Sequence, residues 1–518
     1  MVSRALVLTL LVGCSTNWKD KGEDPNLQGN DDTGGLDTRD DTGGGTGNGD
    51  DTGGTTDTVT DWIDADADGS PASEDCDDDD PATYPGAEEL CDGRDNNCDG
   101  RFDIDEDTDE DGVADCEDYC PVYTSPTGSG DGRVGDPMSS LQDAIDLAGS
   151  SGCNEVRAYQ GTYYENIDWN GWPVNAESVG GAEYTIIDGG DVASVVTFQN
   201  DEGLDARIYG FTLTNGGGSS GAGINISYTS PTIEGNLIYG NAAADANYLG
   251  GGIRIYEGFP EILDNEITDN DAGYGGPENG SDGGGINIRG GGPTIIGNLI
   301  ADNTAGDGGG IWVAYSDAII ANNVISGNEA SDDDPDAGGQ GGGINVQIAG
   351  PDGPFISSNI ISDNVAQMFG GGIVTYEQND SYPAAQITNN TIVFNEVTDT
   401  DNGGGVCQWR RTTPVFTNNI IANNVGVGVF SEDDMDSTFT YNLVYGNDTN
   451  YSGLQGTGTG NLTSDPKFTS ASNDGDWTND DFTLQSTSPA INAGDPSVTD
   501  ADGSRSDMGA YGGPEGGW

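Results

Sequence analysis

The chain of 518 residues is strongly acidic, with 90 Asp or Glu against 15 Lys or Arg, and its net charge of -75 excludes nucleic acid as a natural partner because phosphates would be repelled. It has no His, so no imidazole can act as a base, a nucleophile or a metal ligand. Its 86 Gly follow no Gly-X-Y period, which excludes a collagen-like fibre.

The first 14 residues have the pattern of an export signal. One Arg precedes an apolar run over residues 5–12, which is too short to span a membrane as a helix. The segment ends in LVGC, which resembles the lipobox of bacterial lipoproteins. That resemblance implies a lipid on Cys14 and, because Ser15 follows, export to the outer membrane or cell surface. The alternative is an ordinary signal peptide with an unmodified Cys.

Residues 15–60 form a low-complexity segment. The sequence DDTGG occurs three times, starting at Asp31, Asp40 and Asp50, and apolar residues are scarce. Such a segment cannot bury enough apolar surface to fold, so we predict a disordered tether.

Residues 61–122 are rich in acidic residues that follow a calcium-loop pattern. Oxygen-bearing side chains alternate, Gly follows at the sixth position, and a carboxylate closes the loop, as a hard cation the size of calcium requires. Three such loops are predicted, with the ligands Asp64, Asp66, Asp68 and Asp75; Asp95, Asn97, Asp99, Asp103 and Glu106; and Asp107, Asp109, Asp111, Asp115 and Asp118. The alternative is a solvated acidic spacer without a metal.

Two resemblances support a metal-binding module. The third loop resembles a thrombospondin type 3 repeat, and the segment from Asp75 to Gly100 resembles the Asp/Cys-rich metal-binding motif of bacterial surface proteins. Six Cys between residues 76 and 153 predict three disulfides, with 15 ways to pair them, while zinc is the competing interpretation. Cys407 has no nearby partner in the sequence, so we expect a free, buried thiol.

One unit is repeated eight times between residues 221 and 447. Each copy begins with Gly and Ile or Val, as at Gly252-Ile253, and ends with two Asn five residues apart. The pairs are Asn236/Asn241, Asn265/Asn270, Asn298/Asn303, Asn323/Asn328, Asn359/Asn364, Asn390/Asn395, Asn419/Asn424 and Asn442/Asn447. A fixed core with insertions of variable length is typical of a solenoid.

Apolar side chains sit three residues before and two residues after each first Asn, as Ile262 and Ile267 do around Asn265. Alternation of apolar and polar residues predicts short strands, which must stack copy on copy to bury a core. We therefore predict an all-β, right-handed parallel β-helix with internal Ile stacks and an Asn ladder.

The phrase GGGI followed by P-x-I-x-x-N-x-I-x-x-N resembles the pectate-lyase-like β-helix superfamily, and in particular its bacterial surface and polymorphic outer-membrane members. Residues 141–145 and 156–163 resemble the capping helix and first strands of such proteins, and residues 488–494 and 507–511 resemble their closing segment. We predict a β-helix over 131–470 and a closing segment over 471–518. The superfamily includes lyases, hydrolases and adhesins, so the resemblance does not fix an activity.

Outward side chains of the Gly-Ile strands form a stripe of rings, amides and guanidinium groups. Such groups suit sugars, whose C-H faces stack on aromatic rings while hydroxyls bond polar groups. The predicted glycan face consists of Arg254, Tyr256, Asn287, Arg289, Trp312 and Tyr376. The alternative is that outward strand positions favour these residues without any ligand.

The sequence favours a calcium-binding, lipid-anchored β-helix protein of the cell surface, without enzymatic activity, that contacts a glycan or another surface component. The first alternative is a polysaccharide lyase or glycoside hydrolase of the same fold, although no catalytic residues can be assigned and a dense Asp or Arg motif is missing from the sequence. The second alternative is a structural spacer.

Overall fold

The computed structural model describes residues 66, 70–71, 73–77, 80–81, 83–85, 87, 94–98, 100, 120–218, 221–243, 249–273, 282–332, 339–376, 385–398, 402–409, 413–432, 438–453 and 458–516. The chain divides into two compact units, residues 1–61 and 62–518, and all described residues belong to the second. The predicted export signal, Cys14 and the tether lie outside the described residues.

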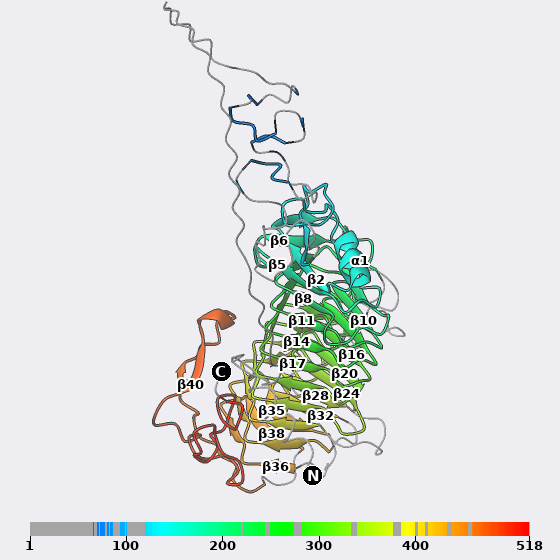
Figure 1. Cartoon of the computed structure of the whole chain (residues 1–518). Helices are drawn as coiled ribbons and strands as arrows, with labels where there is room; N and C mark the ends of the chain where they lie inside the picture. The colour runs from blue at the N-terminus through cyan, green and yellow to red at the C-terminus, as the bar shows by residue number, and fades with distance from the viewer. Residues whose placement is uncertain are drawn as a thin grey trace, which may run out of the picture. The chain divides into compact units, whose positions relative to one another are not determined.

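The fold is a parallel β-solenoid in which each coil contributes one strand to each of three sheets (Figure 1). Sheet I holds the Gly-Ile strands: β4 (Ile167–Asp168), β7 (Val196–Phe198), β10 (Ile224–Ser227), β13 (Ile253–Tyr256), β16 (Ile286–Arg289), β20 (Ile311–Ser316), β24 (Ile344–Ala349), β28 (Ile373–Tyr376), β32 (Val406–Trp409), β35 (Val427–Ser431) and β38 (Thr449–Ser452).

Sheet II precedes the first Asn of each pair. It holds β1 (Val122–Thr124), β2 (Glu155–Ala158), β5 (Asn175–Ser178), β8 (Arg207–Tyr209), β11 (Thr232–Glu234), β14 (Glu261–Leu263), β17 (Thr294–Ile296), β21 (Ile319–Ala321), β25 (Phe355–Ser357), β29 (Gln386–Thr388), β33 (Val415–Thr417) and β36 (Thr438–Thr440).

Sheet III lies between the two Asn. It holds β3 (Gly161–Tyr163), β6 (Thr185–Asp188), β9 (Thr212–Thr214), β12 (Leu237–Tyr239), β15 (Glu266–Thr268), β18 (Leu299–Ala301), β22 (Val324–Ser326), β26 (Ile360–Ser362), β30 (Thr391–Val393), β34 (Ile420–Ala422) and β37 (Leu443–Tyr445). A small fourth sheet follows the second Asn, with β19 (Thr304–Ala305), β23 (Glu329–Ala330), β27 (Val365–Ala366) and β31 (Glu396–Val397).

The core consists of the predicted Ile stacks. Along sheet I, for example, Ile253 pairs in register with Ile286, and Ile286 with Ile311. These side chains are fully buried, as are the equivalent Ile of sheets II and III. The predicted all-β architecture and its internal stacks are confirmed, and the first strand, at Val122, lies before the predicted start at residue 131.

The predicted Asn ladder is present at both corners that flank sheet III. Asn303 illustrates the pattern: its Nδ2 donates to Ile267 O in the preceding coil, at 2.9 Å, and to Asn328 Oδ1 in the next coil, at 3.0 Å. Its Oδ1 accepts hydrogen bonds from the backbone N and the Nδ2 of Asn270, both at 3.0 Å. The ladder therefore satisfies buried polar groups at the two corners that flank sheet III.

Helix α1 (Leu141–Ser151) lies at the first coils, where the sequence predicted a capping helix (Figure 1). Ser140 caps its N-terminus by accepting a hydrogen bond from Asp143 N at 3.1 Å, and Gly152 ends it with a φ of 82°. Leu141, Ile145 and other buried residues of this helix belong to the same hydrophobic core as the first strands. The helix thus covers the end of the Ile stacks.

The C-terminal residues pack against the outer surface of sheet III. An antiparallel hairpin of β39 (Phe468–Ser470) and β40 (Asp481–Leu484) is anchored by Phe482, whose ring centroid lies 6.2 Å from that of Phe394. Further along, Met508 and Ala510 join the same apolar cluster, and Gly509 N donates to Asn418 O at 2.7 Å. This segment therefore lies beside the later coils.

Candidate functional site

One of the three loops predicted to bind calcium is described in part, over residues 95–98 and 100. Asp95, at its first position, accepts a hydrogen bond through Oδ2 from Gly100 N, at its sixth position, at 2.8 Å. Gly100 has a φ of 91°, a conformation that favours glycine, and it turns the chain back toward Asp95. Asn97 is half-buried in the same loop.

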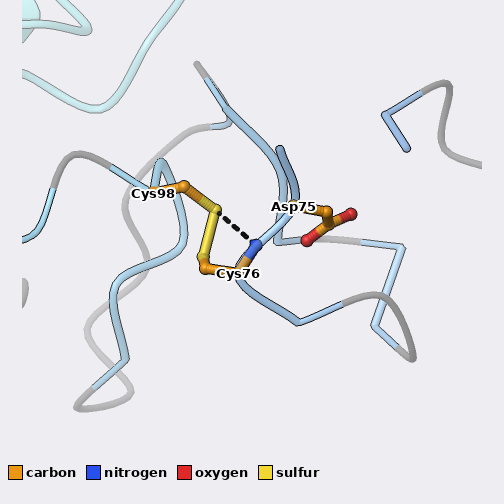
Figure 2. Close-up of side chains that lie close together, drawn as sticks. All are labelled: Asp75, Cys76 and Cys98. Carbon is orange, nitrogen blue, oxygen red and sulfur yellow. Dashed lines mark hydrogen bonds between the residues drawn. A yellow bond between two sulfur atoms is a disulfide. The ribbon is translucent and has the colours of Figure 1, made fainter. Parts of the chain in front are cut away.

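Asp75 lies beside a disulfide between Cys76 and Cys98 (Figure 2). Its Oδ1 accepts from Asp77 N at 2.8 Å, while its Oδ2 is buried and accepts no hydrogen bond. Because both sulfur atoms are bonded to each other, this group offers a metal a carboxylate oxygen and no thiolate. An oxygen donor of this kind suits a hard cation better than zinc.

The remaining predicted metal ligands cannot be placed in the same way. Asp66 is described and half-buried. The others lie outside the described residues, namely Asp64, Asp68, Asp99, Asp103, Glu106, Asp107, Asp109, Asp111, Asp115 and Asp118. They stay predictions.

Of the three predicted disulfides, two lie within the described residues, and the prediction of a free, buried thiol is confirmed. A second disulfide joins Cys120 to Cys153 and ties the segment before β1 to the residues after α1. Cys407 is a free thiol, fully buried, and burial raises its pKa. Cys91 and Cys116 lie outside the described residues.

The predicted glycan face is only partly open. Asn287 and Trp312 point outward from sheet I as expected, but they are only 1% and 4% exposed. The reason lies in the Gly turn before each strand: Asn287 Nδ2 donates to Asp282 O at 3.0 Å, and a Cβ on Gly308 would lie 2.8 Å from the Cβ of Trp312. These turns fold over the outward side chains, so neither residue can stack on a sugar at this surface.

Arg254, Tyr256 and Arg289 do come together. Tyr256 pairs in register with Arg289, and the Arg254 guanidinium lies 5.0 Å from the ring centroid of Tyr256. Arg254 Nη1 also donates to Asn225 Oδ1 at 3.0 Å and to Ser227 Oγ at 3.2 Å, which fixes the guanidinium in place. Arg289, in contrast, is exposed.

Exposed aromatic residues that the sequence prediction missed extend this cluster. The rings of Tyr228 and Tyr256 meet edge to face with centroids 5.1 Å apart, and their hydrogen bond raises the pKa of Tyr228. Tyr228 is 66% exposed and Phe259, in the turn after β13, is 64% exposed. We call Tyr228, Arg254, Tyr256 and Arg289 the aromatic–arginine patch, whereas the Phe259 ring lies beside Gly292 of the next coil. The missed residues follow the ends of strands, where the alternation of apolar and polar residues no longer predicts which way a side chain points. An aromatic residue next to a turn is the sequence feature that could have identified them.

Tyr376 lies outside this patch. It is half-buried at the end of β28 and pairs in register with Trp409 of the next coil. Sheet I is bulged between these two parts, where Tyr315 adopts a φ of 55° and is 44% exposed. The structure therefore places Tyr376 coils away from Arg289, beside an apolar cluster of Phe369, Val374 and Cys407.

Comparison with known proteins agrees with the fold and the module. Residues 186–395 match the family described as "Right handed beta helix region", and residues 75–103 match the one described as "Putative metal-binding motif", whose name refers to copper binding. None of the curated proteins matches the sequence. Among the described residues, no helix has the length and apolar character needed to cross a bilayer.

Several solved β-helix structures are similar. Pectate lyase Pel9A is 20% identical and has a TM-score of 0.48, with 75% of this chain and 95% of that chain covered. The PL6 family alginate lyase AlyGC is 14% identical with a TM-score of 0.31, over 64% and 53% of the two chains. PfbA, a surface adhesin of Streptococcus pneumoniae, is 13% identical with a TM-score of 0.26, over 66% and 92%.

At these identities and TM-scores, the likenesses carry no conclusion about activity or ligand. The two family matches agree with the predicted fold class and with the Asp/Cys-rich module, whereas the metal is not identified by them. Residues 186–395 form a right-handed β-helix region, and residues 75–103 carry an Asp/Cys metal-binding motif.

Proposed function

We propose that this protein is a cell-surface β-helix that binds a glycan through the aromatic–arginine patch, without cleaving it. The observation that carries this proposal is the patch itself. Consecutive coils, about 4.8 Å apart, present Tyr228, Tyr256 and Arg289 side by side. Flat rings stack on the C-H faces of sugars, and guanidinium groups donate to their hydroxyl or carboxylate oxygens.

Export and a lipid on Cys14 complete the proposal. The lipobox resemblance supports an anchor, and the tether over residues 15–60 would hold the β-helix away from the outer membrane. A surface position suits the charge of -75, which favours cationic or neutral partners over anionic ones outside the patch.

The experiment is a glycan array probed with the soluble chain from Ser15 onward, with calcium and with a chelator, followed by an assay for cleavage of each bound glycan. We expect binding without cleavage. Arg289→Ala combined with Tyr228→Ala should weaken binding by roughly tenfold or more, because a ring contact and a charged hydrogen bond are lost. Tyr164→Ala removes a Tyr that is 79% exposed on another coil and should change nothing.

Two results would contradict the proposal. Cleavage of a bound glycan would establish the alternative, a polysaccharide lyase or glycoside hydrolase. Absence of binding to every glycan would leave a structural role or a protein partner instead.

We further propose that the metal of the Asp/Cys module is calcium. Asp75 Oδ2, without a hydrogen bond, and the Asp95–Gly100 loop support oxygen coordination of a hard cation. Removal of calcium should make residues 61–120 sensitive to protease while the β-helix stays intact, because carboxylates at this density repel one another and the Ile stacks need no ion. Limited proteolysis with calcium, copper or chelator measures this. Protection by copper alone, or identical digestion in all three, would contradict calcium.

A further inference from the structure

A groove of about 420 Å³ lies away from the aromatic–arginine patch, between the later coils and the hairpin of β39 and β40. One wall is the corner after sheet III, with Asp302, Gly327, Asp363 and Phe394 in consecutive coils. The other wall is the hairpin loop, which presents Trp477. The volume lies within the roughly 300–1,000 Å³ of ordinary small-ligand sites.

The corner wall is built by the repeat itself. Asp302, Gly327, Asp363 and Phe394 each precede the second Asn of a coil and have φ values between 55° and 67°, so they all turn outward in the same way. Gly327 makes room in this column for the carboxylate of the preceding coil, because a Cβ there would lie 2.4 Å from Asp302 Oδ1. The carboxylate of Asp302 therefore lies against Gly327, and that of Asp363 follows in the next coil.

The hairpin wall is held firmly. Phe482 packs against Phe468 with ring centroids 5.5 Å apart, and both belong to the apolar cluster over sheet III. Within the loop, Asp476 caps the short 3-10 helix Trp477–Asn479 by accepting from Thr478 N at 3.2 Å. This fixed turn places the half-buried indole of Trp477 opposite the carboxylates.

Charge decides what the groove can accept. Four carboxylates line it, those of Asp302, Asp363, Glu396 and Asp476, and none of the described lining residues is Lys or Arg. Burial, together with the nearby carboxylates of Asp480 and Asp474, raises the pKa of Asp363 to about 6. Asp363 Oδ2 and Asp480 Oδ2 are buried and accept no hydrogen bond. Uronates and phosphates are therefore excluded, whereas a ligand with several cationic donors is favoured.

The spacing of the lining side chains further limits the class of ligand that the groove can bind. Asp302, Asp363 and Glu396 belong to coils stacked at about 4.8 Å, so acceptors recur along the groove at multiples of that spacing. Between them lie the apolar Val365 and Phe394, and Trp477 faces them. An indole stacks on the C-H face of a sugar ring and also attracts a cation.

We propose that this groove binds a linear amino-sugar chain, a glycan with a protonated amine on successive rings. The amines pair with the carboxylates of Asp302, Asp363 and Glu396, while a ring stacks on Trp477. The groove and the aromatic–arginine patch share no residue, so this site stands or falls independently of the glycan contact proposed above.

The test uses the soluble chain from Ser15 onward and two ligands with the same sugar backbone, a β-1,4-linked glucosamine tetramer with charged amines and its N-acetylated counterpart with neutral amides. Binding is measured by calorimetry just above the pKa of Asp363, about 6, where its carboxylate is mostly ionised and ring amines still carry protons. We expect the glucosamine tetramer to bind and the N-acetylated tetramer to bind at least about tenfold more weakly. Trp477→Ala should weaken binding of the first ligand by roughly tenfold.

Asp363→Asn provides a second variant that keeps the shape of the side chain, and it should weaken binding severalfold. Asp264→Asn is the matched control, since Asp264 occupies a similar left-handed turn, with a φ of 52°, at the other corner. The patch variant Arg289→Ala should leave the affinity unchanged. Equal binding of both tetramers, full binding by the Trp477→Ala variant, or equally tight binding of spermidine would each overturn the proposal.

Discussion

The Asn corners and the outer surface of sheet I follow the same repeat, yet they differ in how far the repeat determines them. At the corners, Asn303 and Asn328 occupy identical environments, fully buried and hydrogen-bonded to the coils on either side. On the outer surface of sheet I, neighbouring positions in register hold Arg254, Asn287 and Trp312, which differ in size, charge and exposure. Buried side chains must pack against the next coil. The environment of an outward side chain depends instead on the turn that covers it.

The largest expected effect on stability comes from interrupting the Asn ladder, which tests the buried side of this comparison. Asn303→Ala removes the hydrogen bonds that Asn303 makes with Asn270 N, Asn270 Nδ2 and Ile267 O in a fully buried corner, although Asn270 Nδ2 still donates to Ile238 O. At about 1–3 kcal/mol for each of the two other buried groups, we expect a loss of roughly 2–6 kcal/mol. Thermal unfolding followed by circular dichroism measures it.

The control for this experiment is Glu266→Ala, because Glu266 is an exposed residue of β15 whose side chain points away from the core. It should change the melting temperature little. If both variants melted together with the parent chain, the ladder would not stabilise the coils, and its regularity would need another cause.

A second prediction concerns the turns that precede sheet I, where Asp282 and Asp307 are stacked in adjacent coils. The pKa of Asp307 is raised to about 7, mainly by burial and also by the charge of Asp332, while a hydrogen bond from Gln340 N, at 2.9 Å, partly offsets the rise. The folded protein thus holds a proton that the unfolded chain releases near pH 4. The contribution of Asp307 to the free energy of unfolding should therefore be fully present below about pH 4. It should be lost as the pH rises through about 7.

Asp307→Asn keeps the acceptor for Gln340 N and removes the charge. We expect the variant to be more stable than the parent by on the order of 1 kcal/mol above pH 7, and the gain to disappear toward pH 4. Melting temperatures measured across this range test it, with Glu261→Gln on β14 as a carboxylate control. A gain that did not vary with pH would mean that packing, and not protonation, governs this turn.

Much of the fold could be predicted from the sequence because the buried residues repeat from coil to coil. The constant spacing of Asn265 and Asn270 and the Ile between them specify strand, corner and register at once. The Asp95–Gly100 loop was predictable for a similar reason, since a short local pattern encodes its turn. The groove beneath Trp477 was not, because it depends on a hairpin that returns from residues 468–484 to coils as early in the sequence as that of Asp302.

Periodicity could not predict how exposed the outward side chains are. Trp312 provides the most selective test of this point, with the smallest expected effect. Its indole is 4% exposed, and its Nε1 has no hydrogen-bond partner. Trp312→Phe should therefore cost only about 1 kcal/mol of stability and leave glycan binding unchanged. If binding fell as far as it does in the Arg289→Ala and Tyr228→Ala double variant, the turn before β20 would have to open when the ligand binds, and the predicted stripe along sheet I would be continuous after all.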